Sequence, residues 1–214
     1  MNSQRSSLYR PIDSASLEAA RKGRFAGPPA RGEEWKIRHC LPVDAEAYCA
    51  LILPWKAFVE GPSGWLRVRE ECFDGIAEAY DYMRLPMPDR LTLDVWHADF
   101  RMLEDTRAIP PLALAALDRF SNGSKSIFVQ CHHGEDVHNW EIERNLFLSL
   151  EDPFAEMPQP FGTIEVFPAG APWFMLNRDD EPVIYVAGPS GLIHTLDQSC
   201  PGRVISLQLE DRYY

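Results

Sequence analysis

Hydrophobic and polar residues alternate along much of the chain, most regularly in its second half. A period of two is typical of half-buried β-strands, and short apolar runs bounded by turn residues are typical of buried ones. These patterns predict nine strands, at residues 34–41, 47–54, 90–100, 124–131, 141–150, 162–167, 172–176, 182–188 and 203–209. The sequence GPSG at 61–64 predicts a turn.

Apolar residues recur at helical spacing in other segments. They predict helices at residues 14–22, 68–84, 109–123 and 189–199. Ser14 or Ser16 is a candidate N-cap for the first of these helices. Pro110 and Pro111 suit the first turn of the third helix, and the Asn-Gly pair that follows it suits its end.

The order of these elements predicts an α+β fold with a mostly antiparallel sheet and helices packed on it. Strands dominate the second half of the chain, and two helices accompany them. The sequence AGPPARG at 26–32 breaks the first helix and is typical of a linker. We therefore expect a flexible basic N-terminal arm over residues 1–33 and a single α+β domain over residues 34–214.

Charge is distributed unevenly along the 214 residues, whose formal net charge is −11. Residues 1–33 hold six Lys or Arg and three acidic residues, a net of +3; the other 15 basic and 29 acidic residues give residues 34–214 a net of −14. Such an acidic body repels phosphate backbones and attracts a basic partner, so we expect no nucleic-acid binding. Solubility alone also explains the charge.

The lengths of the apolar runs and the spacing of the cysteines both bear on the cellular compartment of the protein. No apolar run approaches the ~20 residues that span a bilayer, so we expect no membrane association. The first 34 residues lack the apolar core of a secretory signal. The five cysteines have no CxxC spacing and fit a reducing cytoplasm, and they are Cys40, Cys49, Cys72, Cys131 and Cys200. We expect a cytoplasmic protein.

The segment QCHHGEDVH at 130–138 gathers three of the six histidines with a cysteine and two carboxylates. Successive side chains at a strand end point to opposite faces, so His132 and His133 are not expected to ligate one ion together. His133, Asp136 and His138 converge if a tight turn joins them, which makes a metal-dependent enzyme one alternative. Acid–base catalysis by Glu135 and His138 is another. We favour an ordinary polar hairpin turn.

Motifs of catalysis and cofactor binding are missing from the sequence. It has no GxSxG elbow, no HExxH helix, no Walker A loop and no GxGxxG motif. Cys131 and His132 are adjacent in a predicted strand, where their side chains diverge. We expect no catalytic residue, no metal ligand and no cofactor, and the sequence favours a protein that is not an enzyme.

Candidate partner-binding residues are carboxylates and tryptophans near predicted turns. NRDDEP at 177–182 is either an ordinary solvated turn or an acidic hairpin tip that faces a basic partner. The two tryptophans on either side of the turn at 61–64 are expected to be exposed interface anchors. The candidate set is Glu135, Asp136, Asp179, Asp180, Glu181, Trp55 and Trp65.

Three stretches of the second half share a family pattern: AIPPLALAALDRFSNGSKSIFVQCHHG, ERNLFLSLEDPF and FPAGAPWFMLNRDDEPVIYVAGPSGLIHTLDQ. Over about residues 106 to 211 the chain resembles a family of uncharacterised bacterial proteins common in actinobacteria. Arg144 matches an arginine of that pattern. His132 and His133 depart from it, because an aromatic residue usually stands there.

In size and acidity the family is similar to immunity proteins, which neutralise bacterial toxins. Together with the acidic body and the missing catalytic motifs, the resemblance favours a non-catalytic binding protein that occludes the active site of a cognate toxin, with an acidic surface against a basic one. Two alternatives stay open. One is the metal-dependent enzyme with His133, Asp136 and His138, and the other is a scaffolding protein whose basic arm recruits an acidic molecule.

Overall fold

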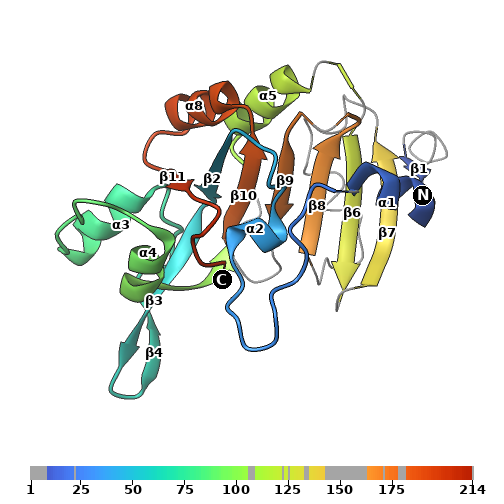
Figure 1. Ribbon diagram of the computed structural model, residues 1–214. Coiled ribbons are helices and arrows are strands. Elements are labelled where there is room, and N and C mark those ends of the chain that lie inside the picture. Colours follow the sequence, from blue (N-terminus) through green and yellow to red (C-terminus); the bar gives the residue numbers. More distant parts are fainter. Residues whose placement is uncertain are drawn as a thin grey trace.

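An antiparallel sheet of eight strands forms the centre of the molecule in the computed structural model (Figure 1). The structure describes residues 9–21, 23–105, 109–121, 123–124, 126–132, 135–142, 163–170, 172–177 and 182–213. Within them the strand order is β1-β7-β6-β8-β9-β10-β2-β11. The bounds are Tyr9–Pro11 (β1), Glu135–Ile142 (β7), Ser126–His132 (β6), Thr163–Pro168 (β8), Phe174–Asn177 (β9), Val183–Gly188 (β10), Ala47–Ile52 (β2) and Val204–Leu207 (β11).

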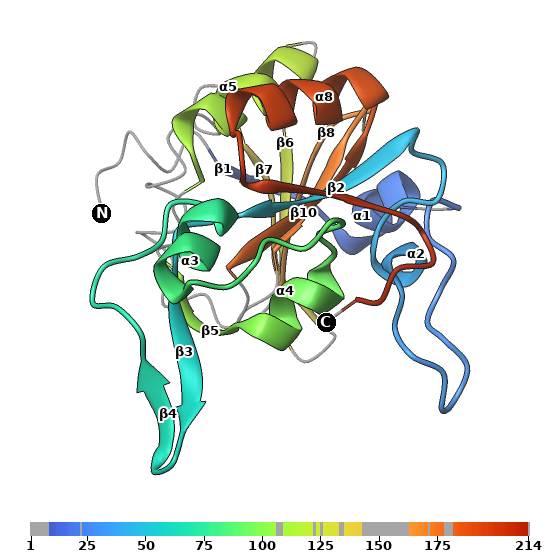
Figure 2. The ribbon, with the colours of Figure 1, turned by 90° about the vertical axis from the view of Figure 1, so that its left-hand side faces the viewer.

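Helices cover both faces of this sheet, which confirms the predicted α+β fold (Figure 2). One face carries α5 and α8, and the other carries α1 to α4 together with a small sheet of order β4-β3-β5. The helices are Ser14–Arg21 (α1), Ile37–Cys40 (α2), Ile76–Met83 (α3), Leu93–Asp99 (α4), Pro111–Phe120 (α5) and Ser190–Ser199 (α8). The small sheet consists of Trp55–Gly61 (β3), Gly64–Arg67 (β4) and Arg101–Asp105 (β5).

The central strand β10 shows why apolar runs become strands here. All six of its residues are buried. Tyr185 and its same-face neighbours pack in the core layer beneath α1 to α4, whereas Ile184 and Val186 pack in the layer beneath α5 and α8. A strand that is covered on both faces carries a continuous apolar sequence instead of an alternating one.

The strand predicted at residues 90–100 is wrong, because α4 occupies Leu93–Asp99. The hydroxyl of Thr92 accepts a hydrogen bond from the Val95 backbone N–H at 3.3 Å and caps the start of the helix. Leu93, Trp96 and Phe100 are buried at spacings of three and four residues. The sequence of residues 90–100 thus contains both a helical spacing and an alternation of period two, and the packing of the folded chain selects the helix.

The strand predicted at residues 34–41 is also wrong. It forms one helical turn, α2, and Ile37 and Leu41 are fully buried one turn apart. The backbone N–H of Ile37 donates to the Asp211 carbonyl at 3.0 Å, which ties this turn to the C-terminal segment. Elsewhere the predicted helix at 68–84 shortens to α3, and residues 143–150 of another predicted strand lie outside the described residues.

The described part of residues 1–33 contacts the sheet. Asp13, and neither Ser14 nor Ser16, caps α1, because its carboxylate accepts from the Ser16 backbone N–H at 2.8 Å. Leu17 is fully buried, and the Arg21 Nε donates to the Glu165 carboxylate of β8 at 3.0 Å. The division into an arm and a domain stays a prediction, and these contacts attach α1 to β8.

Replacement of Glu165 by glutamine tests this attachment. The Arg21–Glu165 pair is mostly shielded from solvent, with side-chain exposures of 23% and 16%. Loss of the charge is expected to raise amide exchange in α1 by about tenfold, the equivalent of about 1.4 kcal/mol of local opening free energy. Hydrogen exchange with mass spectrometry measures the change. Glu18→Gln, at an exposed position of α1, is the control, and equal exchange in the two variants contradicts the expectation.

Candidate functional site

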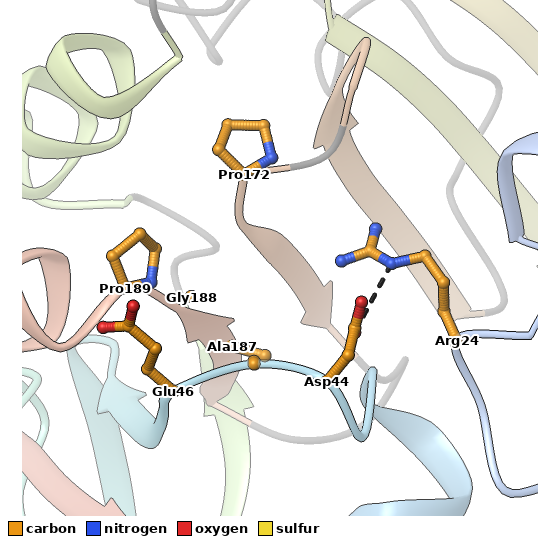
Figure 3. A pocket seen from close by; sticks show the side chains of 8 residues that line it. Arg24, Asp44, Glu46, Pro172, Ala187, Gly188 and Pro189 are labelled. Carbon is orange, nitrogen blue, oxygen red and sulfur yellow. Dashed lines mark ion pairs between the residues drawn. The ribbon is translucent and has the colours of Figure 1, made fainter.

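Two adjacent hollows lie where α1, the loop before β2 and the turns after β8 and β10 meet. Figure 3 shows the first of them. Their volumes are about 160 and 220 Å³, and both are lined by Arg24 and Asp44. The Arg24 Nε lies 3.6 Å from the Asp44 carboxylate. The first hollow is further lined by Glu46, Pro172, Gly188 and Pro189. We call this pair of hollows the Arg24 groove.

Glu46 fills the polar end of the Arg24 groove. Its carboxylate accepts from the Ser190 backbone N–H and from the Ser190 hydroxyl, both at 3.0 Å. The backbone hydrogen bond first, and then the hydroxyl, lower the pKa of Glu46. The chain's own carboxylate therefore takes the position at the start of α8 where the backbone N–H groups attract an anion.

The chemistry available in the Arg24 groove is limited. Its lining consists of one arginine, two carboxylates and otherwise Ala, Gly, Pro, Ile and Phe, so no nucleophile and base stand together among these residues. Each hollow is smaller than the about 300–1,000 Å³ of typical small-molecule sites.

A strongly acidic surface covers α3, α4 and their connections, which we call the α3–α4 lobe (residues 70–99). The two helices lie together beside β3 at one end of the sheet (Figures 1 and 2). The Tyr80 hydroxyl donates to Asp99 at 2.6 Å and joins them. The lobe has two arginines against eight acidic residues, a net of −6. All eight are exposed, and they are Glu70, Glu71, Asp74, Glu78, Asp81, Asp89, Asp94 and Asp99.

Arginines from outside the lobe offset part of this charge. Arg67 donates to Glu70 at 3.2 Å, Arg69 to Glu78 at 2.7 Å and Arg203 to Asp74 at 3.3 Å. The side-chain hydrogen bond from Arg69 is the main reason that the pKa of Glu78 is lowered. Asp81 and Asp89 form no ion pair with any residue that the structure describes. With all three outside arginines counted, the lobe still has a net charge of −3.

Apolar side chains are exposed within the same lobe. Tyr82, Leu85 and Met87 are 50%, 38% and 50% exposed. They lie within six consecutive residues, together with the exposed Arg84, and we call this segment the 82–87 strip. An apolar centre with a polar rim is the usual anatomy of a protein-binding surface.

The lobe also contains a pH-sensitive group, His97. Burial lowers the pKa of this imidazole to about 4, against the opposing effect of Asp94. Between pH 6.5 and 4 the unfolded chain therefore binds a proton that the native protein does not. Acidification across this range is expected to cost on the order of 2 kcal/mol of stability, discounted because the ring is partly exposed.

Urea denaturation between pH 4 and pH 8 measures this loss. The variant His97→Gln is expected to have a flatter profile below pH 6.5, since it has no imidazole to protonate. The variant His194→Gln, at an exposed position of α8, serves as the control. Identical slopes for His97→Gln and the unmodified protein contradict the assignment.

The expectation that Trp55 is exposed is wrong. It is fully buried and packs against Phe73, Trp96 and Phe100, with ring centroids 5.3, 5.3 and 5.1 Å away. Its place near the turn at 61–64 suggested exposure, but Phe73 and α4 pack over the base of the β3–β4 hairpin. Trp65 lies in β4 opposite Glu60, and its side chain is outside the description.

The segment at 130–138 lies in the hairpin of β6 and β7. Glu135 pairs with His132, Asp136 with Cys131 and His138 with Gln130, with a bulge in the register. His133 lies outside the described residues, as do Asp179, Asp180 and Glu181, which follow β9 and precede β10. The described residues include no group of three or more His, Cys, Asp or Glu side chains placed to hold a metal ion.

Comparisons of the chain with models of known protein families, with curated proteins and with solved structures found no match. In the described part of the chain, no helix is both long enough and apolar enough to cross a membrane.

Proposed function

We propose that the protein is a non-catalytic binding protein that docks its acidic surface onto a basic protein partner, and that it acts in the cytoplasm as an immunity protein. The observation that supports this most is the α3–α4 lobe, where eight carboxylates and three apolar side chains are exposed together. The net charge of −14 over residues 34–214 adds a long-range attraction between the protein and a basic partner.

The mechanism is occlusion. A toxin that acts on nucleic acid or on another anionic substrate has a basic active site, and an acidic protein surface is complementary to it. Complementary charge speeds the encounter, and apolar contacts at the centre slow dissociation. Neutralisation by this route needs only binding, so no group of the protein has to take part in chemistry.

Co-expression tests the proposal. The protein encoded beside this gene is produced in a bacterial host with and without this chain, and growth is recorded. We expect growth arrest by the neighbour alone, rescue by co-expression, and a co-purifying complex that weakens as salt increases. A neighbour that neither arrests growth nor binds contradicts the proposal.

Elemental analysis of the purified protein separates this proposal from a metal-dependent enzyme with His133, Asp136 and His138. The proposal expects no stoichiometric metal. One equivalent of zinc, manganese or iron that is lost in His138→Ala supports the enzyme instead.

A further inference from the structure

We propose that the 82–87 strip is the docking surface and that it receives a basic amphipathic segment of a protein partner. This inference rests on the proposed function and assigns it to particular residues. The exposed large apolar side chains in the described part of the chain are Trp35, Val43, Leu66, Tyr82, Leu85, Met87 and Leu112. Three of the seven lie within the strip, so the clustering itself marks this surface.

The aromatic member of the strip is held in place before any partner arrives. The Tyr82 ring packs edge-on against Phe73 at 5.5 Å, and its hydroxyl donates to the Val68 carbonyl at 3.2 Å. The Arg69 guanidinium lies 5.7 Å from the centre of the same ring. Half of the side chain is nevertheless exposed. A rigid, half-exposed tyrosine loses little conformational entropy on binding, which is why such residues serve as anchors.

The rest of the strip has a restrained backbone. The Leu85 N–H donates to the Tyr80 carbonyl at 2.9 Å, which fixes the chain where α3 ends. Pro86 and Pro88 flank Met87 and restrict the backbone torsion angles around it. Leu85 and Met87 are therefore presented from a backbone with few alternative conformations, although nothing in the described residues covers them fully.

Charge around the strip defines the chemistry of the occupant. Asp81 and Asp89 stand on either side of it in the sequence, both exposed and both without an ion pair among the described residues. The exposed Arg84 and Arg90 lie in the same stretch, so the negative charge that favours a basic occupant is that of the lobe as a whole, a net of −3 with the outside arginines counted. An occupant must supply Lys or Arg side chains for these carboxylates and apolar side chains for Leu85 and Met87. A phosphate backbone is negatively charged and would be repelled by these carboxylates, and it offers no apolar side chains. A protein segment is therefore the class of occupant that fits.

The test titrates the full chain with an amphipathic peptide of lysine and leucine, and with a matched peptide in which serine replaces leucine. Amide chemical shifts locate the contact and calorimetry gives the affinity. We expect shifts centred on residues 81–89 and binding of the leucine peptide at least about tenfold tighter than that of the serine peptide, since about 1.4 kcal/mol corresponds to tenfold. Shifts centred elsewhere, equal affinities or no binding overturn the inference.

Surface variants sharpen the result. The double variant Leu85→Ser and Met87→Ser, and separately Asp81→Lys and Asp89→Lys, are each expected to weaken the leucine peptide by about tenfold or more. The matched controls are Leu112→Ser on α5 and Asp197→Lys on α8, both exposed on the opposite face of the sheet. Equal losses in lobe variants and controls overturn the inference. Unchanged melting temperatures show that each variant is folded.

The partner from the growth assay distinguishes the two proposals. If it binds and growth is rescued while the Leu85 and Met87 variants bind it as tightly as the unmodified protein, the surface assignment is overturned and the immunity function stands. If the neighbour neither binds nor arrests growth but the peptide results hold, the immunity function fails and the docking surface stands.

Discussion

Replacement of Trp55 by alanine is expected to lower the free energy of unfolding by about 3 to 5 kcal/mol, the range for large aromatic side chains removed from a core. Trp55 is fully buried between Phe73, Trp96 and Phe100, all of which are themselves buried. Phe73 lies in the segment before α3, and Trp96 and Phe100 belong to α4 and its C-cap, so the three rings cannot all move into the space that the indole leaves. The cavity therefore persists and adds to the lost transfer free energy.

Urea denaturation followed by circular dichroism measures the effect of Trp55→Ala. Leu112→Ala is the matched control, because Leu112 is 63% exposed on α5 and alanine is a good helix former; its change is expected to stay within about 0.5 kcal/mol. A loss below about 1 kcal/mol for Trp55→Ala would mean that Phe73 and α4 do not pack over this ring as described.

Replacement of Gly188 by valine has the second largest expected effect, a loss of about 1 to 3 kcal/mol from overpacking. A Cβ atom at this position would lie 3.0 Å from the Trp173 Cβ and 3.1 Å from a methyl of Leu192. Both neighbours are fully buried, so neither can move aside freely. The two further methyl groups of valine increase the conflict where β10 leads into α8.

Gly191→Ala is the control for this site, since a Cβ there meets only Phe120 at an ordinary 3.7 Å. Because Gly191 is helical, this variant is expected to be neutral or to gain up to about 1 kcal/mol. Thermal and urea unfolding of the two variants should thus differ in sign or at least in size. Equal losses contradict the close packing around Gly188.

The sequence predicted the fold where one structural signal dominated. β2 and β10 follow from apolar runs, and α5 and α8 from helical spacing behind prolines. The failures arose where two periods coexist in one stretch. In α4 the spacing of Leu93, Trp96 and Phe100 competes with a period of two, and only the surrounding core decides which face is buried.

The candidate surface had a sequence signal that residue-by-residue motif searching does not detect. Eight acids against two arginines in residues 70–99 can be counted from the sequence, but their common exposure cannot. The Arg24 groove had no local signal at all. Glu46 and Ser190 are 144 residues apart, and only the folded sheet brings them together.

The position of β2 between β10 and β11 has a consequence for how the chain folds. Cys49 of β2 pairs with Val186, 137 residues later, and with Ser206 on its other side. The N-terminal segments that pack on this sheet must therefore wait until the last strands have been synthesised. Loop closure over such separations is slow. We expect refolding in the range of milliseconds to seconds or slower, and chaperone contact with the apolar residues of β2 while the ribosome completes the chain.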